Sequence, residues 1–153
     1  MIYKSDILIV GSGGAGLRTA IEAHDKGADV LVLGKCKKGD AHTVMATGGI
    51  NAALGTTDPE DNWKIHAIDT LREGRFIADS YEAELLCKLG PDAINDLISY
   101  GVRFHRENDG RLTQRFFGAH TYRRTCFVGD ETGKAIERAL VEQVEKRKIR
   151  FLG

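Results

Sequence analysis

The chain has 153 residues, with 22 basic and 22 acidic side chains and a formal net charge of zero. This balance argues against a general nucleic-acid or membrane-surface binder, and no apolar stretch is long enough to span a bilayer. The length suffices for one domain with a hydrophobic core, and 18 glycines against two prolines suit an α/β fold with tight turns.

A short strand that runs directly into a glycine-rich turn is the first predicted element. The strand covers residues 6–10, and the turn is Gly11-Ser12-Gly13-Gly14-Ala15-Gly16, which has the form G-x-G-x-x-G. A helical pattern follows to residue 23, and a second apolar strand covers residues 29–33. Such a turn lets a pyrophosphate approach bare backbone at the positive end of a helix. The first 35 residues therefore predict a βαβ dinucleotide-binding unit.

The segment after the second strand departs from the common NAD pattern. The acidic residue that usually binds the ribose hydroxyls is absent, and Gly34-Lys35 stands in its place. Residues 35–61 then form a polar, glycine-punctuated stretch that is too long for an ordinary connection. This stretch is therefore expected to carry function.

Helices dominate the next part of the predicted fold. Residues 63–74 have helical spacing, with Asp61 as the expected cap. Residues 79–89 predict a second helix, whose inward-facing residues are expected to be Ala83, Leu85, Leu86 and Leu89. Pro91 is expected to start a separate helix that ends before Gly101.

The last third of the chain predicts a hairpin, a helix and a strand. Residues 102–105 and 112–116 flank Asn108-Asp109-Gly110, a strong hairpin turn signal. The final helix covers residues 130–146, with Asp130 or Thr132 as its cap, and a strand covers residues 149–152. The three long-range strands would be parallel neighbours, which defines an α/β, Rossmann-like sheet with a largely helical insertion. A classic open sheet has more strands, so we expect the first part of a larger enzyme or a subunit that needs a partner.

The remaining polar side chains predict little chemistry by themselves. Cys36, Cys87 and Cys126 are odd in number and widely spaced, which favours free thiols in a reducing compartment over a metal site. His66 is expected on a helix surface. The N-terminal residues lack the layout of a signal peptide.

Residues 42–54, His-Thr-Val-Met-Ala-Thr-Gly-Gly-Ile-Asn-Ala-Ala-Leu, resemble the flavin-attachment region of the flavoprotein subunits of succinate dehydrogenase and fumarate reductase. The resemblance continues through Asp61-Asn62-Trp63 and the segments 100–104, 109–118 and 122–133, so that it covers nearly the whole chain. L-aspartate oxidase is a close relative of this family, and Gly118-Ala119-His120-Thr121-Tyr122-Arg123-Arg124 resembles it more.

The resemblance implies a fold that is incomplete relative to the family, with FAD as its cofactor. It divides the chain into a dinucleotide unit at 1–35, the flavin loop, helices and hairpin at 36–128, and a helix with the third strand at 129–153. Lys35 would lie near the adenosine, and the loop would wrap the isoalloxazine ring. The implied cofactor-binding residues are Gly11, Ser12, Gly13, Gly14, Ala15, Gly16, Lys35, His42, Thr43, Val44, Ala46, Thr47, Gly48 and Gly49.

His42 is the candidate for covalent attachment, because the histidine before Thr-Val is bonded to the flavin in succinate dehydrogenases. The alternative is a loop histidine that merely contacts FAD. The family commonly has glutamine where Thr47 stands, so a contact is altered there. Gly48 and Phe104 match positions that border the dicarboxylate, although Phe104 equally suits core packing.

The implied reaction is hydride transfer between a C4 dicarboxylate and FAD, as in the tricarboxylic acid cycle and electron transport. Arg123 or Arg124 could hold a carboxylate, or serve a structural role. No catalytic residue is assigned, because the family's catalytic acid and capping domain lie outside this sequence.

The implied partners are the remainder of the flavoprotein, membrane anchor subunits and an iron–sulfur subunit, with no nucleic acid and no metal site in this chain. The implied location is the cytoplasm, at the inner face of the cell membrane as a peripheral subunit. L-aspartate oxidase and a non-catalytic flavin-binding fragment that needs a partner chain are the alternative functions.

Overall fold

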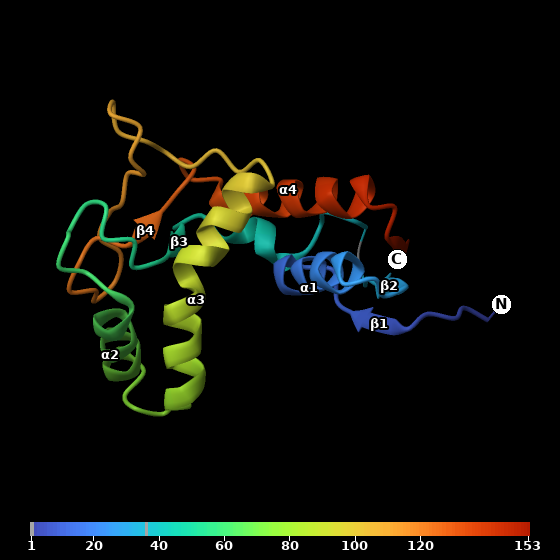
Figure 1. Ribbon diagram of the computed structural model, residues 1–153, viewed down its shortest axis with the longest axis horizontal. Helices are drawn as coiled ribbons and strands as arrows, with labels where there is room; N and C mark the ends of the chain where they lie inside the picture. The colour runs from blue at the N-terminus through green and yellow to red at the C-terminus, as the bar shows by residue number, and fades with distance from the viewer. Residues whose placement is uncertain (1, 36) are drawn as a thin grey trace. The chain divides into compact units, whose positions relative to one another are not determined.

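The computed structural model describes residues 2–35 and 37–153, so any expectation for Cys36 lies outside the described residues. The chain forms two compact units. The first comprises residues 1–46 and 133–153, and the second comprises residues 47–132. Figure 1 traces both units in chain order.

The first unit is built on a parallel sheet of three strands. These are β1 (Ile7–Val10), β2 (Val30–Leu33) and β5 (Arg150–Leu152), in the order β1-β2-β5. Leu8 pairs with Leu31, and Val32 pairs with Phe151. The expected parallel neighbours are therefore confirmed, with the apolar strand β2 in the centre.

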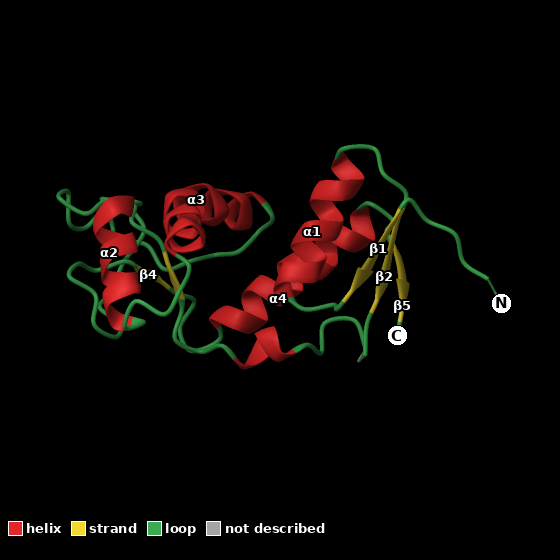
Figure 2. Cartoon of the chain, turned by 90° about the horizontal axis from the view of Figure 1, so that it is seen from below, coloured by secondary structure: helices red, strands yellow, loops and turns green. Residues whose placement is uncertain are grey.

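Two helices, α1 (Gly14–Asp25) and α4 (Thr132–Lys146), lie on one side of this sheet (Figure 2). Their apolar residues recur at helical spacing, so one face of each helix is buried. The resulting core contains Leu17, Ala20, Ile21, Val32, Leu140 and Val144. Gly16 is required where α1 meets the turn, because a Cβ at this position would overlap the carbonyl oxygen of Gly11.

The second unit combines two helices with a small antiparallel ladder. The strands are β3 (Ile50–Asn51) and β4 (Thr125–Cys126), and Ile50 pairs with Cys126. Helix α2 (Trp63–Glu73) packs against α3 (Ser80–Ser99). Cys87 and Cys126 are buried free thiols, and burial raises the pKa of Cys126 to about 11.

The cap of α2 differs from the sequence expectation. Asn62, and not Asp61, caps the helix by accepting from the backbone N–H groups of Lys64 and Ile65. Asp61 is buried instead and pairs with Arg124. The expectation was wrong because a partner 63 residues along the chain competes for this carboxylate.

Helix α3 is continuous, so the expected break at Pro91 was wrong. Proline removes the N–H that would bond to the carbonyl of residue 87, and Gly90 before it has no Cβ to clash with the ring. The inward placement of Leu85, Leu86 and Leu89 was also wrong, because all three are exposed. The buried face of α3 carries Ala83, Cys87, Ile94 and Leu97.

The expected hairpin is reduced to a turn with one bridge. Gly110 N donates to the carbonyl of Glu107, and Arg106 pairs with Leu112 in an isolated antiparallel bridge. The returning segment binds elsewhere in the second unit: Arg115 exchanges backbone hydrogen bonds with Thr125, and Gln114 donates to the carbonyls of Ala52 and Arg124. These long-range partners replace the ladder that the expected hairpin would have formed. Among the described residues, no helix combines the length and the apolar character needed to cross a bilayer.

Candidate functional site

The turn between β1 and α1 presents bare backbone. The N-cap of α1 is Gly13, which supplies no side-chain cap, and the first turn contains no acidic residue. The positive end of the helix is therefore not compensated by its own side chains. Ser12 is buried within this turn. These are the properties that a pyrophosphate requires.

A short 3-10 helix, His42–Met45, lies beside the turn in the same unit. Thr43 Oγ1 accepts from Gly14 N at 2.9 Å, and a Cβ at Gly13 would meet the same oxygen at 3.1 Å. The threonine thus joins the candidate flavin segment to the candidate phosphate turn. His42 itself is exposed at the start of this helix, as is Lys35 directly after β2.

The start of α4 contacts the C-terminal end of the 3-10 helix. Gly133 N donates to the carbonyl of Ala46 at 2.7 Å. A side chain at Gly133 would overlap the carbonyl oxygens of Thr43 and Ala46. The segment that carries His42 is therefore fixed between the glycine turn and α4.

These residues of the first unit fit FAD. The glycines of the turn carry no side chains of their own, and the start of the helix favours an anion. Thr43 and Val44 lie within the same unit, and His42 has an accessible ring. The sequence-predicted residues from Gly11 to Gly16 and from His42 to Ala46 are thus brought together.

The predicted residues of the second unit form their own small cluster. The ring of Phe117 packs against Gly48, so that a Cβ added to this glycine would lie only 2.8 Å from the Phe117 Cζ atom. Arg115 Nη2 donates to the carbonyl of Gly48 at 2.9 Å, whereas Thr47 is exposed. Phe104 is only 5% exposed and belongs to the core of this unit. Its assignment to the substrate stays a prediction, as does that of Gly48.

Arg124 is completely buried and bound by two carboxylates. Its guanidinium donates to Asp61 at 2.8 Å and to Asp69 at 2.7 Å. Burial alone would raise the pKa of Asp69, but hydrogen bonds from Thr121 and Arg124 outweigh it and hold that pKa below its usual range. Arg123 pairs with Asp58 in the same way at the surface. Both arginines are therefore structural in the described residues, and neither is left to hold a dicarboxylate.

A pocket of about 680 Å³ with two histidines was not predicted from the sequence. His66 and His120 meet edge to face, with ring centroids 5.8 Å apart. His66 is buried, so its expected surface position was wrong. Burial, and then the charge of Arg124, lowers the pKa of His66 to about 4. A single histidine in a helical pattern gives no signal of this arrangement, since His120 comes from a distant loop.

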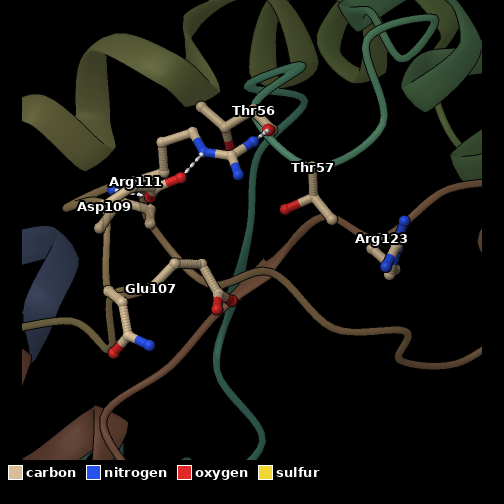
Figure 3. A pocket seen from close by; sticks show the side chains of 8 residues that line it. Thr56, Thr57, Glu107, Asp109, Arg111 and Arg123 are labelled. Atoms are coloured by element: carbon tan, nitrogen blue, oxygen red, sulfur yellow. Dashed lines mark hydrogen bonds and ion pairs between the residues drawn. The ribbon is translucent and has the colours of Figure 1, made fainter.

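Another pocket, of about 490 Å³, lies beside the turn at residues 107–111 (Figure 3). Arg111 donates to Asp109 and to the carbonyl of Thr56. Arg123 at its edge is occupied by Asp58. Because these cations are already paired, the pocket is a surface feature of the hairpin rather than an anion site.

The parallel sheet, the glycine turn and the helix that begins at this turn define a dinucleotide-binding domain. The FAD binding domain family matches residues 6–153, and the chain belongs to this family. Its cofactor is FAD, as the sequence predicts.

The chain is similar to larger flavoproteins. It is 45% identical over 151 residues to one of the subunits of the fumarate reductase (CoM/CoB) of Methanothermobacter marburgensis, covering 97% of this chain and 27% of that protein. It is 40% identical over 157 residues to the succinate dehydrogenase flavoprotein subunit of Rickettsia bellii, covering 97% and 26%. A solved structure, Mycobacterium smegmatis Sdh1 in complex with UQ1, superposes with a TM-score of 0.93 at 40% identity, covering 98% and 27%. The chain thus spans about a quarter of the length of these relatives.

Proposed function

We propose that this chain is the FAD-binding portion of a succinate dehydrogenase or fumarate reductase flavoprotein. The carrying observation is the pairing of the glycine turn with the His42–Met45 segment through Thr43, in a chain whose relatives bear those names. The proposed reaction is hydride transfer between a C4 dicarboxylate and FAD. When bound, FAD supplies the redox chemistry.

The residues of the first unit would bind and orient the cofactor. The backbone of the turn from Gly11 to Gly14 would hold the pyrophosphate, because its three glycines carry no side chains and the helix α1 begins there. Thr43 fixes the neighbouring segment, so that His42 is presented from an ordered helix rather than from a free loop. Lys35 would lie near the adenosine end.

The residues of the second unit would shape the substrate side. Gly48, backed by Phe117 and Arg115, would border the dicarboxylate. The proton donor and the capping domain would come from outside this chain, so the chain alone is expected to bind FAD without turnover. In the complete assembly, membrane anchors and an iron–sulfur subunit would accept the electrons at the inner face of the membrane.

The mass of the denatured chain tests the role of His42. Protein produced with ample FAD should carry a covalently added flavin, and His42→Ala should remove it while noncovalent FAD binding persists. Thr43→Val should weaken noncovalent binding, because it removes the hydrogen bond that holds the 42–45 segment beside the glycine turn. An unmodified wild-type mass defeats the covalent assignment and leaves contact without a bond.

A dye-linked oxidation assay tests the activity. It uses the gene product that contains this chain, taken from its own cells, with succinate and aspartate as rival substrates. Turnover of succinate supports the proposal, and turnover of aspartate alone identifies an L-aspartate oxidase instead. Flavin binding without turnover of either substrate supports the non-catalytic alternative.

A further inference from the structure

Arg115 is a half-buried cation that no carboxylate neutralises. Its guanidinium forms no ion pair within residues 2–35 and 37–153, whereas Arg123 and Arg124 of the same unit both bind aspartates. The Nε–H of Arg115 is buried, and no described residue accepts a hydrogen bond from it. A buried donor without a partner costs free energy. Stability alone therefore does not account for an arginine at this position.

Two contacts fix the guanidinium of Arg115 in place. Its Nη2 donates to the carbonyl of Gly48 at 2.9 Å, and its Cζ lies 4.1 Å from the centroid of the Phe127 ring. That ring lies in turn against His105, with the two centroids 4.7 Å apart. The backbone of Arg115 is held as well, because it exchanges hydrogen bonds with Thr125 of β4. The positive charge is therefore fixed relative to Gly48.

The same contact orients the peptide bond between Gly48 and Gly49. This bond is trans, so the Gly49 N–H points in the opposite direction from the carbonyl that Arg115 holds. A Cβ at Gly49 would lie 2.5 Å from Thr125 Cγ2 and 2.6 Å from the carbonyl oxygen of Cys126, which shows how closely Gly49 packs against β4. No acceptor for the Gly49 N–H is present among the described residues, and Gly49 borders the pocket of about 680 Å³. The N–H is therefore left for a ligand.

This arrangement favours negative charge on a ligand beside the peptide. A hydrogen bond from a cation to the Gly48 carbonyl polarises the amide group and strengthens its N–H as a donor. Two-electron reduction of FAD with uptake of one proton leaves one negative charge on the flavin. A fixed positive charge close to the ring system stabilises this reduced state relative to the oxidised one.

We propose that Arg115 is a positioning residue that raises the reduction potential of the bound FAD. It holds the Gly48 carbonyl, directs the Gly49 N–H towards the flavin and places an unneutralised charge behind this peptide. Arg115 acts through the peptide and does not itself touch the cofactor. The inference rests on the proposed function and on the implied cofactor contacts of Gly48 and Gly49.

The reduction potential of the bound FAD tests this proposal. It is measured in the gene product that contains this chain, by gradual reduction with dithionite at equilibrium with a dye of known potential. Arg115→Met should lower the potential, because it removes the charge and releases the Gly48 carbonyl. We expect the equilibrium constant for reduction to fall about tenfold, which corresponds to about 30 mV for a two-electron couple.

Two further variants separate this role from a merely structural one. Arg115→Lys should recover most of the potential, because an ammonium group keeps the charge and can donate to the Gly48 carbonyl. Arg103→Met removes an exposed arginine of the same unit and is the matched control, which should leave the potential unchanged. The free energy of unfolding is measured beside each potential, because a structural role would lower it without moving the potential of the flavin-loaded protein.

Phe127→Leu decides the question if Arg115→Met does not retain FAD. It removes the ring that holds the guanidinium while the charge remains. The equilibrium constant for reduction should then fall in the same direction but only about threefold. An unchanged potential in Phe127→Leu would overturn the proposal in that case.

Equal potentials in the wild type and in flavin-loaded Arg115→Met overturn the proposal, as does an equal shift in Arg103→Met. Malonate, a dicarboxylate that offers no bond to dehydrogenate, checks the other anion that could lie there. Weaker malonate binding by Arg115→Met at an unchanged potential would assign Arg115 to a carboxylate and overturn its role at the flavin. The potential is measured without any dicarboxylate, so a failure of the proposed activity towards succinate is distinguishable from a failure of this inference.

Discussion

Arg124 is the buried cation that pairs with two buried carboxylates of the second unit. Removing it would leave Asp61 and Asp69 buried together without their cation. Breaking a buried ion pair from one side typically costs about 3–5 kcal/mol. We therefore expect Arg124→Met to lower the free energy of unfolding by that amount, as measured by urea denaturation.

The matched control is Arg123→Met, one position earlier. Its side chain is 43% exposed and pairs with Asp58 at the surface, so its loss should matter far less. Equal effects of the two substitutions would contradict a special role for the buried cluster.

His66 makes stability depend on pH. Its pKa is lowered from 6.5 to about 4, chiefly by burial and then by the charge of Arg124. At pH 7 the ring is neutral in both the folded and the unfolded state. Below 6.5 the unfolded chain takes up a proton that the folded chain refuses, so the free energy of unfolding falls until about pH 4.

This shift in the pKa of His66 predicts that the free energy of unfolding falls by about 3 kcal/mol between pH 7 and pH 4. His66→Gln should be less stable at neutral pH, yet its stability should decline less steeply with acid. Urea denaturation at several pH values measures both slopes. Parallel slopes for the wild type and the variant would show that His66 does not titrate in this way.

At the residue scale, sequence reasoning works where the chemistry is local. The G-x-G-x-x-G turn can be predicted from six consecutive residues, because the strand, the turn and the helix are adjacent in the sequence. The binding of Asp61 by Arg124 joins residues 63 positions apart, and no local pattern encodes it. His66 shows the same limit, since the histidine ring that it contacts comes from the loop at residue 120.

Helix α3 tolerates a proline that propensity would place at a boundary. Pro91 lies inside the helix, where it removes one backbone hydrogen bond. Pro91→Ala restores this donor, although it also frees the unfolded chain. We expect a net gain of about 1–2 kcal/mol in the free energy of unfolding, after both effects.

Thermal or urea unfolding would measure this gain. Asp92→Ala, an exposed neighbour on the same helix, should change stability by no more than about 0.5 kcal/mol. A destabilised Pro91→Ala chain would mean that packing of the half-buried ring outweighs the missing hydrogen bond.

At the element scale, periodicity predicts where helices and strands exist but not how they are joined or used. The strands at β1, β2 and β5 and the helices α1, α2 and α4 follow from their apolar spacing. The continuity of α3 does not follow from apolar spacing. The helix continues through Pro91 because Gly90 before the proline has no Cβ to clash with its ring. The 3-10 helix at His42–Met45 also escapes a pattern search, since its form depends on Thr43 and on the start of α4.

At the scale of the molecule, the first unit is assembled from both ends of the chain. Its strand β5 returns after more than a hundred residues to pair with β2, as the rule for parallel neighbours predicts. The second unit occupies residues 47–132. The boundary of this unit is set by long-range contacts, so composition and turn signals do not reveal it.

The sheet of the first unit has a bare apolar face, which yields a prediction for the whole chain. Leu8 and Val10 are 56% and 76% exposed, and they point to the opposite face from Ile9 because side chains alternate along a strand. Ile9 packs against α1, where its methyl lies 3.5 Å from the position of a Cβ on Gly16. An exposed apolar strand at the edge of a sheet promotes association between copies.

We therefore expect the chain to self-associate at high concentration, and Leu8→Thr/Val10→Thr to shift it towards the monomer. Both replacements keep strand propensity, so the free energy of unfolding should change by no more than about 1 kcal/mol. Ile9→Thr is the contrasting variant: it should destabilise the fold without relieving association, because its side chain faces the core. Sedimentation velocity over a concentration series, with urea denaturation beside it, separates the two effects. A monomeric wild type at all concentrations would show that this face does not drive association.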